Sequence, residues 1–262
     1  MNYEKWDEIL APYQHAVEEL KVKFKNIRKE FLTKGEYSPI EFVTGRTKKI
    51  SSIISKANRL DTNDIEGKID DIAGIRIMCQ FVDDIDKVIE LLRARKDMQI
   101  LYEKDYVRNV KESGYRSYHM IIKYTVYTAE GPQEILAEFQ IRTLAMNFWA
   151  TIEHSLNYKY KQHIPEDLKI KLKEAADSAF NLDEQMLEIK DEIKDAQRLF
   201  EVKSDIISNI MNNIITLMSI GRAMEASRYQ VMLNKLVDEG EVWELNSLLD
   251  SIKKDIERYR EN

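Results

Sequence analysis

Two segments near the middle of the chain, separated by a short loop, constrain the fold most. Residues 115–127 and 134–143 are rich in the aromatic and β-branched residues that favour strands. The residues between them, TAEGPQ, contain the glycine and proline of a hairpin loop. Two further strands are expected at 71–81 and 98–108, with a helix at 83–97 between them. We therefore expect an α+β fold, with a mixed, mainly antiparallel sheet of about five strands flanked by helices.

Helical periodicity dominates both ends of the chain. A narrow apolar stripe, in which spacings of four and three residues alternate, predicts one long N-terminal helix; it comprises Trp6, Leu10, Tyr13, Val17, Leu20, Phe24, Ile27 and Phe31. Ser38 as N-cap and Pro39 at the first helical position predict a second helix, interrupted near Gly45. Further helices are expected around residues 50–57, at 144–163, and from Pro165 to about residue 200.

The last part of the chain has a helical pattern of its own. Gly221 and Gly240 separate three apolar segments, and the last of these has heptad-like spacing. We expect a domain spanning residues 1–200 and a helical C-terminal extension spanning residues 201–262, to which no role is assigned.

Charge and composition limit the classes of function. The chain of 262 residues has a formal net charge of -6, which argues against generic binding of duplex nucleic acid but leaves room for a local basic site. Cys79, the single cysteine, lies in an apolar run and is expected to be a buried thiol of a cytosolic protein. No apolar run approaches the ~20 residues of a membrane span. The acidic N-terminus is no signal peptide, so we expect a cytoplasmic protein.

Carboxylates at two strands suggest a metal site. In the strand AEFQIRT, the side chains of Glu138, Gln140 and Arg142 share one face, and Phe139 faces the other. A carboxylate in mid-strand must be paired, hydrogen-bonded or bound to a metal. Glu138 together with Asp71, which precedes a buried strand, would suit Mg²⁺. The alternative is an ion pair between Glu138 and Arg142 on an open sheet face.

Cationic side chains supply a candidate anion site. The segment after residue 45 carries a row of polar and basic residues, namely Arg46, Lys48, Ser52, Lys56 and Arg59. Such a row is often only a solvated helix face. Arg76 inside an apolar strand indicates a negatively charged ligand or an aromatic base to stack on. The chain contains neither G-x-x-x-x-G-K-[ST] nor G-x-G-x-x-G, so side chains rather than a glycine-rich loop would bind phosphate.

The segment KESGYRSYH suits a purine nucleotide. Gly114 would let the chain turn so that Tyr115 presents its ring to a flat ligand, while His119 offers a hydrogen bond and Lys111 a charge. The alternative is that His119 is a structural residue, and Tyr118 is expected in the core.

Four blocks resemble one enzyme family. SPIEFVTGR, DIAGIRIMCQFVDDI, KESGYRSYH and AEFQIRTLAMNFWATIEHSLNYKY are similar, in this order, to the small alarmone synthetases, the single-domain members of the RelA/SpoT homologue family. The resemblance covers roughly residues 3–200. It implies a nucleotidyltransferase-like synthetase fold and transfer of the pyrophosphoryl group of ATP to the 3′-hydroxyl of GTP or GDP. The products would be AMP and the alarmone (p)ppGpp of the stringent response. The chain lacks a His-Asp dipeptide, so no hydrolase activity is expected.

The resemblance also implies roles for the residues above. Arg46 and Arg76 would hold the adenine between them. The ATP phosphates would lie against Lys48, Ser52, Lys56 and Arg59. Asp71 and Glu138 would hold Mg²⁺, and Glu138 would act as general base. The guanine nucleotide would lie against Tyr115, Lys111, His119 and Gln140.

One branch of this family is a tetramer that binds (p)ppGpp allosterically. The matching residues here are Lys21, Lys25, Arg28, Glu41, Phe42, Thr44 and Asn147, so a homotetramer and product activation are expected. The alternative for the first three is a solvated helix face. The rival functions are a nucleotide- or single-stranded-RNA-binding regulator, since exposed aromatic and cationic side chains can serve both, and an unrelated phosphotransferase.

Overall fold

The computed structural model describes residues 3–62, 64–159 and 165–260. The chain forms two compact units, Met1–Leu187 and Glu188–Asn262, and helix α6 (Glu166–Ser219) contributes to both. The expected boundary at residue 200 therefore lies within a continuous helix.

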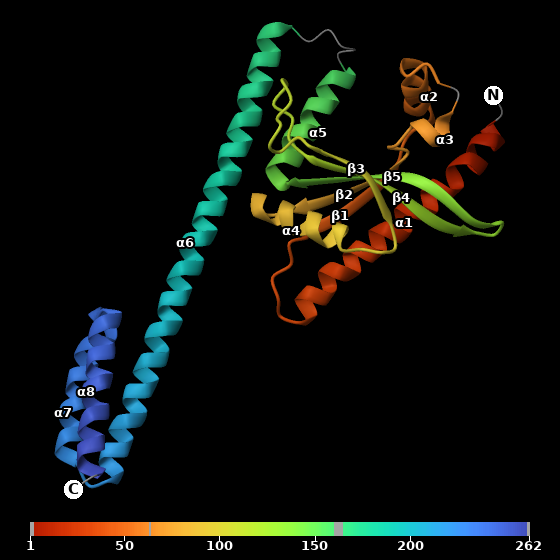
Figure 1. Ribbon diagram of the computed structural model, residues 1–262. Coiled ribbons are helices and arrows are strands. Elements are labelled where there is room, and N and C mark those ends of the chain that lie inside the picture. Colours follow the sequence, from red (N-terminus) through yellow and green to blue (C-terminus); the bar gives the residue numbers. More distant parts are fainter. Residues whose placement is uncertain (1–2, 63, 160–164, 261–262) are drawn as a thin grey trace. The chain divides into compact units, whose positions relative to one another are not determined.

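A five-stranded sheet organises the first unit (Figure 1). Its strands are β1 (Phe42–Thr47), β2 (Ala73–Cys79), β3 (Gln99–Asp105), β4 (Tyr118–Thr128) and β5 (Gly131–Thr143). The order is β1-β2-β5-β4-β3, and every neighbouring pair is antiparallel except β2 and β5. The predicted mixed, mainly antiparallel sheet and its β4–β5 hairpin are confirmed.

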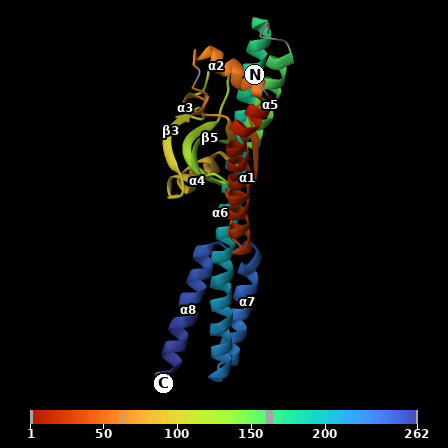
Figure 2. The same ribbon diagram turned by 90° about the vertical axis from the view of Figure 1, so that its right-hand side faces the viewer.

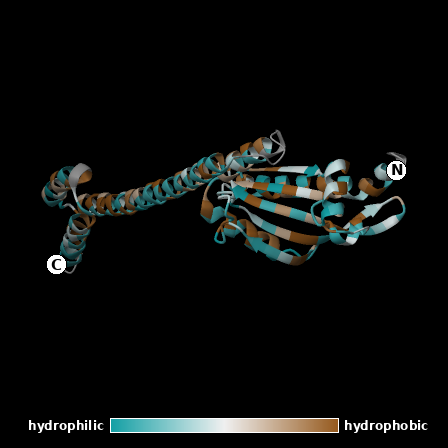
Figure 3. Ribbon diagram, turned by 90° about the horizontal axis from the view of Figure 1, so that it is seen from above, coloured by the Kyte–Doolittle hydropathy of each residue, from teal (hydrophilic) through white to brown (hydrophobic). Residues whose placement is uncertain are grey.

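The helices of this unit are α1 (Tyr3–Thr33), α2 (Ile50–Arg59), α3 (Ile65–Lys68), α4 (Val82–Arg93), α5 (Leu144–Lys159) and the first part of α6. The apolar side chains of α1 and α4 pack with those of the strands in one core. Phe24 of α1 meets Phe139 of β5 edge to face, with ring centroids 5.1 Å apart. Apolar and polar residues alternate along the strands (Figure 3), so the opposite face of the sheet is left polar.

The helix predicted to begin at Ser38 is wrong. The Ser38 hydroxyl accepts a hydrogen bond from the Ile40 amide (3.2 Å), which forms a local turn, and β1 begins at Phe42. Pairing with β2 decides this segment, since the β1 backbone packs closely under α1 at Gly45. A Cβ there would lie only 2.8 Å from Cγ1 of Val17. A local capping signal is overruled by tertiary packing.

The second unit is a bundle of three helices. The end of α6 packs with α7 (Ala223–Glu239) and α8 (Val242–Arg260) (Figure 2). Its core contains fully buried Ile210, Leu217 and Ile252. Gly221, with φ of +79°, makes the turn after α6 that other residues adopt only with strain. None of the helices in the described residues is long and apolar enough to span a membrane.

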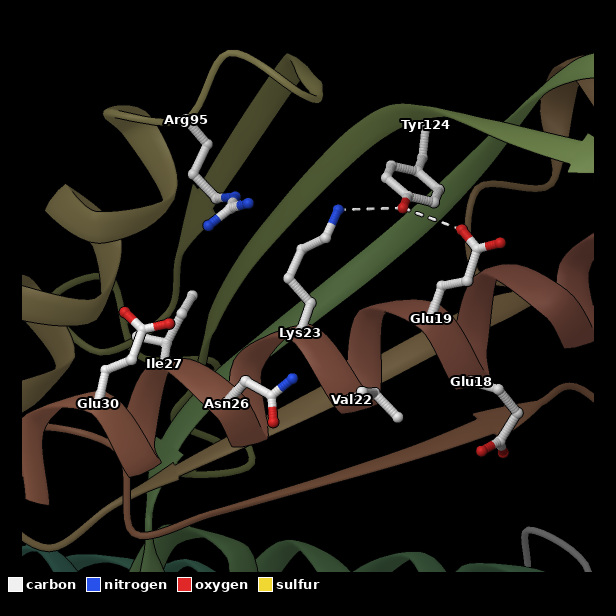
Figure 4. Close-up of a pocket in the computed structure, with 9 residues that line it drawn as sticks. All are labelled: Glu18, Glu19, Val22, Lys23, Asn26, Ile27, Glu30, Arg95 and Tyr124. Atoms are coloured by element: carbon white, nitrogen blue, oxygen red, sulfur yellow. Dashed lines mark hydrogen bonds between the residues drawn. The ribbon is translucent and has the colours of Figure 1, made fainter. Parts of the chain in front are cut away.

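A shallow groove of about 770 Å³ lies along the side of α1 (Figure 4). Lys23 donates to the Tyr124 hydroxyl (3.1 Å) and pairs with Asp97 (2.6 Å), while Tyr124 donates to Glu19 (3.0 Å). These bonds attach α1 to β4. Both cations that line the groove, Lys23 and Arg95, already pair with Asp97, so we assign no ligand to it.

A buried carboxylate should make stability depend on pH. Burial raises the pKa of Asp183 to about 6, although Thr143 donates a hydrogen bond to it (2.5 Å). The unfolded pKa is about 4, so between roughly pH 4 and pH 6 the folded state holds a proton that the unfolded state has lost. Stability therefore falls as pH rises through this window. Asp183→Asn should stabilise the protein at pH 8 by up to about 3 kcal/mol, and the gain should shrink towards pH 4 in denaturant titrations. A gain that does not change with pH would contradict this assignment.

The core of the second unit can be tested by itself. Ile210→Ala should destabilise the bundle by about 2–5 kcal/mol, because it leaves a cavity among fully buried side chains. Hydrogen exchange should quicken across residues 206–256 and stay unchanged in the sheet. Ile215→Ala is the matched control, since Ile215 is 61% exposed and should have little effect. Equal effects of the two substitutions would refute the packing described.

Candidate active site

The register of three strands builds a polar site on the face opposite α1. In β2, Arg76 lies between Thr44 of β1 and Gln140 of β5, and Gly74 lies between Arg46 and Glu138. These rows border a pocket of about 250 Å³, lined by Thr44, Gly45, Arg46, Asp71, Gly74, Arg76, Glu138 and Gln140. A Cβ at Gly74 would touch only the Arg46 carbonyl, at 3.6 Å. Glycine therefore keeps open the space between an arginine and a carboxylate.

Glu138 is held by a chain of hydrogen bonds. One carboxylate oxygen bonds Nδ1 of His119 (2.8 Å), and the other accepts from Nε2 of Gln140 (2.7 Å). Nε2 of His119 bonds the Tyr115 hydroxyl (2.8 Å), to which Arg142 donates (3.1 Å). Because a carboxylate only accepts hydrogen bonds, Nδ1 is the donor to Glu138, and Nε2 can then accept from the Tyr115 hydroxyl. Arg142, the alternative ion-pair partner of Glu138, thus bonds Tyr115 instead and also donates to Gln140.

Asp71 sits among lysines. Its carboxylate pairs with Lys48 (2.6 Å) and with Lys56 (3.0 Å), and Lys56 also pairs with Asp70 (2.6 Å). Burial alone would raise the pKa of Asp71, but hydrogen bonds and charge attraction from the two lysines outweigh it and lower the pKa. Asp71 is therefore a carboxylate at neutral pH. Tyr102 of β3 donates to Asp70 and extends this cluster.

The other residues predicted to bind ATP are more exposed to solvent. Ser52, Lys56 and Arg59 share a face of α2, whose opposite face buries Ile53 and Ala57 in the core, and Ser52 and Arg59 are exposed. Arg46 is also exposed on β1.

The guanidinium groups of this site crowd one another. Arg76 donates from Nε to Gln140 (3.2 Å). Its pKa is lowered by burial and then by the nearby charges of Arg142 and Arg46. Such positive groups, partly desolvated and close together, are unfavourable until an anion binds among them. This arrangement therefore favours a ligand that carries several negative charges.

Tyr115 belongs to an aromatic cluster beside Glu138. Its ring lies 5.8 Å from His119 and 6.5 Å from Trp149, between centroids. The Lys111 ammonium lies 4.9 Å from the same ring and 4.3 Å from that of Tyr106. Burial raises the pKa of Tyr115, so its hydroxyl stays protonated. Gly114 turns the chain before it with φ of +86°. The structure thus gathers Lys111, Tyr115 and His119, although β4 begins only at Tyr118.

Sequence reasoning gave no role to four residues that the structure places around this site, namely Asp70, Tyr102, Tyr106 and Trp149. It considered Arg142 only as an ion-pair partner of Glu138, whereas the structure bonds it to Tyr115 and Gln140. Tyr102, Tyr106 and Trp149 come from distant segments and have no local signal.

The predicted allosteric residues come from three segments. Lys21, Lys25 and Arg28 lie on α1, Asn147 lies on α5, and Glu41, Phe42 and Thr44 lie at or just before the start of β1. Thr44 also lines the pocket described above. Arg28 donates to the Ile40 carbonyl (3.1 Å) and lies 3.9 Å from Glu41, while Lys21 pairs with Glu18 (2.7 Å). Lys25, Phe42 and Thr44 are exposed. The buried Oδ1 of Asn147 has no hydrogen-bond partner in the described residues.

The side chains of Asp71 and Glu138 are ligands of the kind that Mg²⁺ prefers. Asp71, two residues before β2, and Glu138 of β5 line the same pocket. Within the described residues, no cluster of three or more His, Cys, Asp or Glu side chains could hold a metal. Two carboxylates completed by phosphate oxygens and water are typical of Mg²⁺ rather than of a metal held by protein alone.

Residues 45–163 match the region found in RelA / SpoT proteins. The chain is 53% identical over 205 residues to the GTP pyrophosphokinase YjbM of Bacillus subtilis (strain 168), covering 78% of this chain and 97% of that relative.

Two solved structures are similar as well. The small alarmone synthetase 1 of Bacillus subtilis bound to its product pppGpp is 54% identical, with a TM-score of 0.70 over 72% of this chain and 98% of the other. A GTP pyrophosphokinase family protein from Streptococcus pneumoniae is 53% identical, with a TM-score of 0.71 over 76% and 98%. Nearly complete coverage of these relatives at such identity shows the family: the chain belongs to the small alarmone synthetases of the RelA/SpoT family.

Proposed function

We propose that this protein is an ATP:GTP 3′-diphosphotransferase, which transfers the pyrophosphoryl group of ATP to the 3′-hydroxyl of GTP or GDP. The observation that carries the proposal is the Tyr115–His119–Glu138 hydrogen-bond chain bordering an arginine-lined pocket in a member of this family. The similarity to a synthetase solved with pppGpp supports the product.

The donor nucleotide would bind across β1, β2 and α2. Arg46 and Arg76 project from neighbouring strands into the pocket and can stack on the two faces of adenine. Lys48 and Lys56 stand at its edge, where Ser52 and Arg59 continue the row along α2. This places positive charge beside a triphosphate, whose β-phosphorus is the atom to be attacked.

The acceptor would bind beside β4 and β5. Guanine would stack on Tyr115, while Lys111, His119 and Gln140 border the nucleotide. Glu138 is positioned as general base, because His119 and Gln140 orient its two oxygens.

In the reaction, Glu138 takes the proton of the 3′-hydroxyl, whose oxygen attacks the β-phosphorus. The bond from this phosphorus to the α–β bridging oxygen breaks, and AMP leaves. Arg46, Arg76, Lys48 and Lys56 stabilise the negative charge of the transition state. Mg²⁺ held by Asp71 and Glu138 would neutralise the β- and γ-phosphates. We propose that the reaction takes place in the cytoplasm.

We also propose that the protein forms a homotetramer activated by (p)ppGpp. Two contacts between α1 and the β1 segment support a polar site there: Arg28 lies 3.9 Å from Glu41, and the Lys21 side chain lies close to Gly45. Asn147 lies on a separate helix, α5.

Label transfer tests the reaction directly. Protein, Mg²⁺ and ATP labelled at the γ-phosphate are incubated with GTP or GDP, and products are separated by thin-layer chromatography. Label should appear in pppGpp or ppGpp, and Glu138→Gln should reduce the rate by about 10²–10⁴-fold because it removes the base. Glu134→Gln is the control, since Glu134 lies on the same strand but pairs with Lys123 on the surface. If no guanine nucleotide gains label, even with pppGpp added, a nucleotide- or RNA-binding regulator becomes the better proposal.

Product activation predicts a charge-dependent response. Lys25→Glu should abolish the stimulation by added pppGpp, because it replaces an exposed cation of the proposed site with an anion that repels phosphate. Basal activity should be unchanged. Lys254→Glu makes the same charge change on α8 and should leave stimulation intact. Initial rates measured with and without pppGpp decide this, and full stimulation of Lys25→Glu would rule out the site.

A further inference from the structure

The loop between β3 and β4, residues 106–117, carries Lys111 and Tyr115, and its backbone bonds are local. The amides of Tyr106, Asn109, Lys111 and Gly114 donate to the carbonyls of Ser117, Asp105, Tyr115 and Lys111, at 3.0, 3.1, 3.4 and 2.8 Å respectively. None of these bonds joins the Tyr115 side of the loop to another helix or strand of the unit. Side-chain contacts must do this.

Arg116 makes such contacts with α6. Its Nη2 donates to Oδ1 of Asp177 (3.1 Å), and its guanidinium carbon lies 4.3 Å from the centre of the Phe180 ring. Nη1 donates to the Gly114 carbonyl (3.3 Å). The side chain is only 12% exposed. One planar group therefore joins the loop backbone to two residues of α6, as arginine's fork of donors permits.

The loop backbone also rests on this part of α6. A Cβ at Gly114 would lie 2.6 Å from the Cβ of Ala176, so only glycine allows this approach. Trp149 of α5, whose ring neighbours Tyr115, donates to the Leu172 carbonyl of α6 (2.7 Å). Residues 172–180 of α6 thus support Tyr115 from two directions.

We infer that Arg116 is a positioning residue for the acceptor nucleotide, which it serves by holding Tyr115 and Lys111 against α6 through Asp177 and Phe180. The inference rests on the proposed function and extends it. Arg116 itself contacts neither the pocket nor Glu138. Its loss therefore affects the guanine nucleotide and leaves ATP binding, which depends on β1, β2 and α2, unchanged.

Steady-state kinetics with each substrate varied in turn provide the test. Arg116→Ala should raise KM for GTP about tenfold or more, the usual effect of losing a charged hydrogen bond, with KM for ATP unchanged. Arg116→Lys, which keeps the charge but not the fork, should restore part of the affinity. Asp177→Ala should resemble Arg116→Ala, and the double variant should be no worse than Arg116→Ala because the pair acts as a unit. Arg108→Ala is the control, since Arg108 lies in the same loop but pairs with Asp86 on the surface.

Hydrogen exchange gives a second readout that needs no activity. Residues 106–117 should exchange faster in Arg116→Ala and Asp177→Ala, with the sheet unchanged. Asp177 is half exposed, so its substitution should fold even if Arg116→Ala does not. Three results in Arg116→Ala and Asp177→Ala would each overturn the inference: an unchanged KM for GTP, an equal rise in KM for GTP and ATP, or unchanged hydrogen exchange in residues 106–117. A wild-type protein that makes no alarmone would instead refute the proposed function.

Discussion

The parallel pairing of β2 with β5 is the constraint on which the site depends. Its register places Gly74 beside Glu138 and Arg76 beside Gln140, while antiparallel β1 brings Arg46 to the other side of Gly74. A shift by one residue would turn these side chains into the core and Ile75 and Phe139 towards solvent. Burial of that apolar face under α1 and α4 therefore fixes the register, and the register assembles the polar face.

Part of this arrangement is local and could be predicted. The alternation in AEFQIRT predicted that Glu138 and Gln140 face away from the core, and the burial of Phe139 and Ile141 confirms it. Strand β1 could not be predicted in this way. The segment FVTGRT has no strong strand pattern, and a serine–proline pair before it mimics a helix start. Only the edge of β2 and the close approach of α1 at Gly45 define its structure.

Contacts between distant segments account for the rest. Tyr102 reaches Asp70, and α6 reaches Arg116, across separations that no short pattern records. The net charge of -6 was equally uninformative about the site. Positive charge is concentrated around one pocket by five side chains, those of Arg46, Arg76, Arg142, Lys48 and Lys56. The acidic excess lies elsewhere in the chain. The roles of the individual site residues remain predictions.

The hydrogen-bond chain from Tyr115 to Glu138 links an aromatic ring to a carboxylate through His119. The ring of Tyr115 offers a stacking surface, and its hydroxyl bonds the imidazole that orients Glu138. With Nδ1 donating to Glu138, Nε2 of His119 can accept from the Tyr115 hydroxyl, which links the two residues through one ring. Under the proposed roles, a guanine stacked on Tyr115 would contact the same residue that bonds the imidazole orienting Glu138. Acceptor binding and the orientation of the Glu138 carboxylate would then be coupled through Tyr115, so contacts that fix Tyr115 would also fix Glu138.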